Sequence, residues 1–140
     1  MTSPQPSGYS GTPLPKKLGI KAGHRVLFHD APDGFDPRPL PEDVAVDRVP
    51  DAGPYDVILA FVPDRAALAE AYATLPAKMV KNGALWICWP KKASKIETDV
   101  SESVVRDEAL ALPAGLVDVK IAAVDATWSG LKLVYRLERR

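Results

Sequence analysis

A lysine-rich loop contains the residues whose types and spacing best suit ligand binding. Residues 89–95 read WPKKASK and include Lys91, Lys92, Ser94 and Lys95. Lysine ammonium groups bind phosphate or carboxylate as point charges, and a nearby serine hydroxyl can add a hydrogen bond. The loop therefore predicts a site for a small anion. The alternative is a solvent-exposed loop with ordinary surface lysines.

Four further residues could join this site. His29 and Asp30 follow one another at the end of a predicted strand, where a histidine could act as a general base. Asp125 and Trp128 lie in a predicted strand connection, with Asp125 as a base or salt-bridge partner and Trp128 as a stacking platform. Each has a structural alternative: His29 packs at the strand end, Asp125 shapes a turn, and Trp128 covers the sheet edge. We assign all of these as candidate binding residues and none as catalytic.

Apolar segments predict the strands that would position these residues. Residues 25–29 (RVLFH), 56–62 (DVILAFV) and 84–89 (ALWICW) are apolar at consecutive positions, which is typical of strands buried on both faces. Residues 44–49 predict a short strand beside them.

Helical patterns lie between and after these strands. Apolar residues recur at helical spacing over residues 65–80, with Asp64 as the N-cap and Gly83 as a stop signal. A second helix is predicted to begin at Asp99, with Glu102 three positions later as in a capping box.

The chain starts with a short helical turn and ends in a predicted β-hairpin. Residues 12–18 predict one turn of helix capped by Thr12. Residues 118–124 and 131–137 read as strands, and the connection at residues 125–130 is too short for a parallel crossover. We therefore expect these two strands to be antiparallel.

The order of elements predicts a compact Rossmann-like α/β domain, with a mostly parallel sheet and a C-terminal antiparallel hairpin. We expect a single domain at residues 12–140 and a disordered or loosely ordered tail at residues 1–11, where serine, proline and glycine predominate. The segments YDVILAFV, LPAKMVKNGALWICWP and GLVDVKIAAVDATWSGLKLVYRL resemble the second half of class I methyltransferase folds. That resemblance covers residues 56–137 and implies an architecture only.

A second resemblance covers nearly the whole chain. Its residues are 8–14 (GYSGTPL), 17–21 (KLGIK), 31–32 (AP), 89–91 (WPK), Asp125 and 128–131 (WSGL). In these phrases the chain resembles a small bacterial family, domain of unknown function 3052. The resemblance implies a compact Rossmann-like fold, but no activity and no catalytic residue.

The segment after the first strand lacks the glycine-rich loop that nucleotide sites of this fold use. It reads HDAPDGFDPRP over residues 29–39, with Gly34 as its one glycine. Glycines let the backbone turn tightly and approach a phosphate, and Asp30 and Asp33 would repel one. We therefore predict no dinucleotide cofactor, whereas S-adenosylmethionine stays open because its sulfonium is a cation. Asp47 could bind ribose hydroxyls, or it is an ordinary strand-end carboxylate.

The amino-acid composition limits which cellular environments and which binding partners we expect. The 18 Lys and Arg balance the 18 Asp and Glu, so no field of the whole chain draws it to nucleic acid or to an anionic membrane. The single cysteine, Cys88, lies in an apolar run and indicates a reducing, cytoplasmic location. Two histidines and one cysteine form no recognisable metal set, so we expect no metal. The sequence shows neither a secretory signal nor a membrane-spanning run.

Together these features predict a non-catalytic module that binds a small anionic metabolite or a protein partner. The site would lie where the segments at residues 29–35, 63–65, 90–98 and 125–129 converge at the carboxyl edge of the sheet. The alternative is a divergent methyltransferase-like enzyme that uses S-adenosylmethionine, with residues of this edge as acid, base or orienting groups. A third prediction is self-association, in which the apolar hairpin pairs edge to edge in a homodimer.

Overall fold

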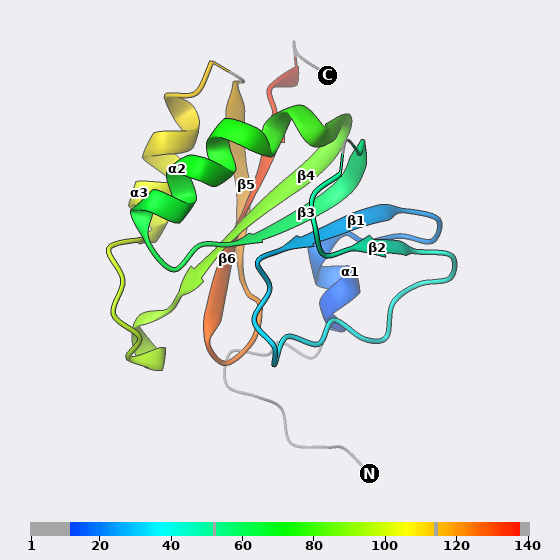
Figure 1. Ribbon diagram of the computed structural model, residues 1–140, viewed down its shortest axis with the longest axis horizontal. Helices are drawn as coiled ribbons and strands as arrows, with labels where there is room; N and C mark the ends of the chain where they lie inside the picture. Colours follow the sequence, from blue (N-terminus) through cyan, green and yellow to red (C-terminus); the bar gives the residue numbers. More distant parts are fainter. Residues whose placement is uncertain (1–11, 52, 114, 138–140) are drawn as a thin grey trace.

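The described residues form a six-stranded sheet. Figure 1 shows how its strands and the helices around them are arranged. The computed structural model describes residues 12–51, 53–113 and 115–137, so the predicted tail at residues 1–11 lies outside the described residues. The strands are β1 (Arg25–His29), β2 (Ala45–Asp47), β3 (Tyr55–Phe61), β4 (Met79–Pro90), β5 (Leu116–Ala123) and β6 (Trp128–Tyr135).

The strand order is β2-β1-β3-β4-β6-β5. β1 pairs in parallel with both β2 and β3, and β3 pairs in parallel with β4. β6 runs antiparallel to both of its neighbours, β4 and β5, so β5 points the same way as β4. This arrangement confirms the α/β fold with a mostly parallel sheet and a C-terminal antiparallel hairpin. Because β6 inserts beside β4, β5 forms the edge of the sheet.

Helices cover both faces of the sheet. α2 (Arg65–Thr74) and α3 (Glu102–Leu110) pack on one side, which we call the α2/α3 face. The short α1 (Leu14–Leu18) packs on the other side, the α1 face, together with part of the long segment between β1 and β2. Two short 3-10 turns, η1 (Pro76–Lys78) and η2 (Lys92–Ser94), lie before and after β4.

The core consists of two apolar layers, one on each face of the sheet. Trp86 lies in the layer of the α1 face with no exposed surface, and Trp89 lies in the opposite layer. The Trp86 indole N–H donates to the carbonyl of Leu18, 3.0 Å away, and so attaches the end of α1 to the sheet. Cys88 is fully buried in the same layer as Trp86, and burial raises the pKa of its thiol.

The helix predicted to extend to about residue 80 ends earlier. Its predicted N-cap is confirmed, because the Asp64 carboxylate accepts the N–H of Ala67 at 2.8 Å. Pro76 then stops α2, since proline has no N–H to donate and its ring clashes with the preceding turn. The chain forms η1 instead, and β4 begins at Met79.

Gly83 has a packing role instead of the predicted role as a helix stop. It lies inside β4, where an added Cβ would be 3.0 Å from the carbonyl oxygens of Asp56 and Val80. The pairing of β3 with β4 shifts register nearby, between Tyr55 and Val57. Glycine therefore allows the two backbones to approach at this irregularity.

Two other predicted helix caps are wrong. The N-cap of α3 is Ser101, whose hydroxyl accepts a backbone N–H of the first turn. Asp99 instead accepts the backbone N–H of Arg65 at 2.9 Å, so its carboxylate serves the first turn of α2. At α1 the N-cap position is Pro13, one residue after Thr12, and no side chain caps the helix.

The hairpin connection is shorter than the predicted residues 125–130. Trp128 already begins β6 and pairs with Pro90 of β4. Gly130 pairs with Cys88 on one side and with Ala122 on the other. The turn between β5 and β6 is therefore tight, and the two strands are paired close to its ends.

We expect Gly130→Ala to lower the free energy of unfolding by about 1–3 kcal/mol, because the added methyl group would press on the buried Trp86 ring. Its Cβ would lie 3.0 Å from Cε3 of Trp86 and 3.1 Å from Cγ2 of Val124. Gly34→Ala is the matched control, because an added Cβ there meets nothing within 4 Å. Urea unfolding measures both variants. Equal stability of Gly130→Ala and the wild type would contradict this packing.

Candidate functional site

The four segments predicted to converge do meet at the carboxyl edge of the sheet. The backbone N–H of Lys91 donates to the carbonyl of Thr127 at 2.9 Å, which joins the lysine loop to the hairpin. The hydroxyl of Thr98 donates to the carbonyl of Pro63 at 2.7 Å, which joins the same loop to the start of α2. The remaining segment, after β1, reaches the hairpin through aromatic rings.

A row of aromatic rings links the segment after β1 to the hairpin. The Phe35 ring lies edge-on to those of Phe28 and Phe61, at centroid distances of 5.2 and 5.0 Å. Phe61 lies edge-on to Trp128 at 5.2 Å. Phe35 is buried, and it lines a hollow of about 560 Å³ beside β1, near the place where glycine loops of this fold receive a nucleotide. Trp128 packs within the row, which favours its structural role.

The lysine loop is stabilised by its own hydrogen bonds. Lys95 follows η2 in the left-handed conformation, with φ of 61°. The Ser94 hydroxyl donates to the carbonyl of Lys91 at 2.7 Å and accepts the N–H of Ile96 at 3.2 Å. Ser94 therefore shapes the loop, and its hydroxyl proton is already used.

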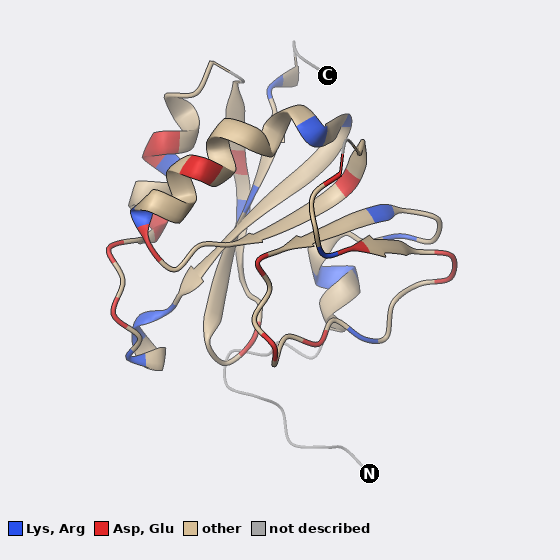
Figure 2. Cartoon of the chain, viewed as in Figure 1, with Lys and Arg blue, Asp and Glu red and all other residues tan. Residues whose placement is uncertain are grey.

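A hollow of about 710 Å³ lies between the lysine loop, β4 and the start of α3. Its charged lining residues are Lys91, Lys92, Lys95, Glu97, Asp99 and Glu102. Figure 2 shows both signs of charge along the segment between β4 and α3. Because the acids would repel an anion, this hollow lacks the single-sign charge that the predicted anion site needs.

His29 and Asp30 form a pair at the end of β1. His29 Nε2 lies 3.4 Å from the Asp30 carboxylate, and Asp30 adopts a positive φ of 56°. The other ring nitrogen of His29, Nδ1, is buried and has no hydrogen-bond partner in the described part of the chain. A buried polar atom without a partner is costly, so Nδ1 is an unsatisfied polar group at this edge.

Asp125 shapes the hairpin turn. Its Oδ1 accepts the backbone N–H groups of Thr127 and Trp128, each at 2.8 Å. A carboxylate that accepts two backbone N–H groups in this way is typical of an Asx turn. These bonds favour the structural alternative for Asp125.

Asp47, the last residue of β2, belongs to a polar network with the first residues of β1 and β3. Its carboxylate accepts the Tyr55 hydroxyl at 2.6 Å and pairs with Arg25 at 3.0 Å. The hydrogen bond from Tyr55, followed by that from Arg25, lowers the pKa of Asp47. The network favours a structural role for this carboxylate over the binding of ribose.

The structure also groups lysines that the sequence analysis did not select. Lys120 on β5 lies directly opposite Lys132 on β6. Both belong to the α1 face, because Lys132 pairs with Trp86 and the Lys120 ammonium lies 6.0 Å from the centroid of the Trp86 ring. Lys17 of α1 donates from Nζ to the carbonyl of Ala123 at 3.0 Å. The alternation of side chains along a strand can predict the face of the sheet on which a lysine lies. Which lysines come together across the strands depends on strand register.

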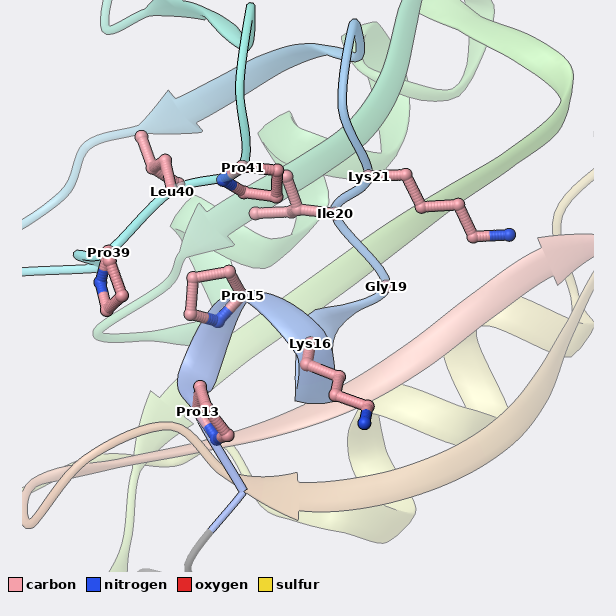
Figure 3. Close-up of a pocket in the computed structure, with 9 residues that line it drawn as sticks. All are labelled: Pro13, Pro15, Lys16, Gly19, Ile20, Lys21, Pro39, Leu40 and Pro41. Atoms are coloured by element: carbon pink, nitrogen blue, oxygen red, sulfur yellow. The ribbon is translucent and has the colours of Figure 1, made fainter.

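A hollow of about 410 Å³ separates α1 from the segment before β2 (Figure 3). Prolines line both of its sides: Pro13, Pro15, Pro39 and Pro41. Figure 3 shows that the ammonium groups of Lys16 and Lys21 point away from these prolines. The charge around α1 therefore lies outside this apolar hollow.

Comparison with solved structures agrees with the fold. The crystal structure of TrmN from Thermus thermophilus matches 89% of this chain with a TM-score of 0.50 and 15% sequence identity. The match spans 47% of that chain, about half of its length. A likeness at this identity shows the Rossmann-like fold alone. No protein-family model and no curated protein sequence matches this chain, and the resemblance to domain of unknown function 3052 stays a prediction.

None of the helices in residues 12–51, 53–113 and 115–137 combines the length and apolar character needed to cross a membrane. Within the same ranges, no three His, Cys, Asp or Glu side chains come together as a metal site requires. The cytoplasmic location stays a prediction.

We expect Asp125→Ala to lower the free energy of unfolding by about 1–3 kcal/mol, because two backbone N–H groups of the turn lose a charged acceptor. Asp125→Asn is the control, since its amide oxygen can still accept both hydrogen bonds. Thermal unfolding of the two variants checks the result. If Asp125→Ala were as stable as the wild type, the turn role would be wrong and Asp125 would return to the candidate ligand-binding residues.

Proposed function

We propose that this chain is a non-catalytic module that binds a small anionic ligand on a Rossmann-like sheet. The observation that carries the proposal is the placement of three lysines on or beside the α1 face. Lys21, Lys120 and Lys132 form no ion pair with an acid in the described part of the chain. Like charges directly opposite one another on neighbouring strands destabilise a sheet. An anion that binds beside them would offset that cost.

Contacts at the carboxyl edge support a binding module rather than a methyl-donor site. The segment after β1 carries the buried Phe35 where a glycine-rich loop would be needed, and Asp47 is bonded to Tyr55 and Arg25. A nucleoside-containing cofactor would need an open backbone cradle and a carboxylate available for its ribose. Neither requirement is met by these residues.

The second candidate is a divergent methyltransferase-like enzyme that uses S-adenosylmethionine. The observation that favours it is the sheet, in which β6 inserts antiparallel between β4 and β5, together with the likeness to TrmN. In such an enzyme His29, Lys91 and Asp125 would be the acid, base or orienting groups at the carboxyl edge.

A protein partner is the other form of the binding proposal. Val119 and Ile121 on the edge strand β5 are 53% and 50% exposed. An open edge strand with apolar side chains can pair with another chain, including a second copy of this one. Pairing through β5 would place a partner at the side of the hairpin, away from β1 and β3.

We expect S-adenosylmethionine and S-adenosylhomocysteine to leave the melting temperature of the full chain unchanged at millimolar concentration. A ligand present at 100 times its dissociation constant would stabilise the protein by about 2.7 kcal/mol, so binding of useful strength would be detected. Calorimetric titration with both compounds checks the result. Heat of binding from either would overturn the non-catalytic proposal and favour the transferase.

The same melting measurement, with a panel of metabolites that carry phosphate or carboxylate groups, tests whether the chain binds an anion. Ionic strength is kept constant with sodium chloride, so that general screening is the same in every sample. At least one anion should raise the melting temperature above its value in chloride, because it binds only the folded state. A panel in which no anion exceeds chloride would contradict the proposed function.

A further inference from the structure

A hollow of about 360 Å³ lies on the α1 face, at the amino edge of the parallel strands. It is bounded by the end of α1, the turn before β1, the first residues of β3, and parts of β4 and β6. The polar residues that bring side-chain donors to it are Lys21, His24, Asn82 and Lys132. Parts of the chain that are distant in sequence thus direct hydrogen-bond donors to one place.

Two lysines give this hollow its positive charge. The Lys132 ammonium lies beside the end of α1, since a Cβ added to Gly19 would be 3.8 Å from Nζ. Lys132 is half-buried, and its pKa is lowered by burial and then by the charges of Lys120 and Lys21. A partly buried ammonium without a counter-charge is costly. An anion bound beside Lys132 would supply such a counter-charge.

Two neutral side chains add donors to the same hollow. His24 Nδ1 accepts the backbone N–H of Lys21 at 3.1 Å. The proton of the neutral imidazole is therefore on Nε2, which can donate to a ligand. The amide nitrogen of Asn82 offers two further N–H groups. Charged and neutral donors together suit a ligand with several acceptor oxygens.

Two acceptor oxygens near the hollow already receive hydrogen bonds. Asp56 is the one acid among the described residues that line it, and its Oδ2 accepts the backbone N–H of Arg25 at 2.8 Å. At the end of α1, the Leu18 carbonyl accepts the Trp86 indole N–H at 3.0 Å. Hydrogen bonding of these oxygens reduces their repulsion of an anion in the hollow.

We propose that this hollow binds the phosphate group of a small phosphate monoester, an inference that rests on the proposed function and gives it a site and a ligand class. The two charges of the phosphate dianion match Lys21 and Lys132, and its remaining oxygens match the donors of His24 and Asn82. The volume of about 360 Å³ is at the lower end of small-molecule pockets, which suits a compact ester.

The test titrates the full chain with inorganic phosphate and with phenyl phosphate while backbone amides are followed by NMR. The titration is carried out well above the second pKa of a phosphate monoester, about 6, at a pH where phenyl phosphate and inorganic phosphate are both mainly dianions, and at constant ionic strength. We expect the largest shift changes at the amides of Gly19, His24 and Asn82. Lys132→Gln should weaken the binding of phenyl phosphate at least tenfold. Lys81→Gln is the matched control, an exposed lysine of β4 outside this hollow, and should bind as the wild type does.

The stability of Lys132→Gln without ligand shows whether weaker binding comes from a lost ligand contact or from a folding defect. Lys132→Gln removes one of two like charges that face each other across β5 and β6. Its melting temperature without ligand should therefore equal or exceed that of the wild type. A melting temperature well below the wild type would show that Lys132 is needed for folding, and would contradict the inference.

The possible outcomes test the proposed phosphate site and the proposed function separately. If phenyl phosphate binds Lys132→Gln normally but no longer binds a variant with Lys91, Lys92 and Lys95 all changed to Ala, the site is wrong and the binding function stands. If neither phosphate nor any carboxylate binds the wild type, both proposals are wrong. If a short single-stranded RNA binds far more tightly than phenyl phosphate, the ligand is a nucleic acid and the small-molecule class is wrong.

Discussion

The packing of Trp86 sets the geometry of the α1 face. Its ring is fully buried, and its indole N–H donates to Leu18 at the end of α1. The ring also lies against Gly130, where a Cβ would come within 3.0 Å of it. One side chain thus fixes the distance between α1 and the hairpin. It thereby positions Lys21, which follows α1, relative to Lys132 of β6, and gives the sheet a positively charged surface away from its carboxyl edge.

Sequence patterns predict correctly the structural features that neighbouring residues determine. They fail for features that depend on contacts between residues distant in sequence. β1 coincides with the apolar run at residues 25–29, and Asp64 caps α2 because its partner is three residues away. A glycine suits both a helix end and a close approach of two strands, and only the position of β3 shows that Gly83 serves the second. Asp99 was misassigned for a similar reason: its acceptor role is decided by where α2 begins.

In the candidate site, too, the sequence predicts some features correctly and misses those that depend on distant contacts. Parallel strands predict that the loops after them meet, and they do, but the sequence does not reveal which side chains the loops use for their own bonds. Ser94 and Asp125 are residue types that suit both turns and ligand sites, and here both stabilise turns. The pairing of Lys120 with Lys132 was missed because the predicted connection was too long, and a longer turn pairs different residues.

The carboxyl edge and the α1 face therefore differ in what they offer a ligand. The hollow beside the lysine loop is lined by charges of both signs, whereas the hollow on the α1 face is lined by Lys21 and Lys132, which form no ion pair with an acid among the described residues. The most direct measurement is a crystal structure of the full chain with arsenate, a phosphate analogue whose arsenic is located by anomalous scattering. We expect the arsenic between Lys21 and Lys132, within hydrogen-bond distance of His24. Arsenic beside His29 instead, or no bound arsenate at concentrations that alter the amide spectrum, would contradict this account.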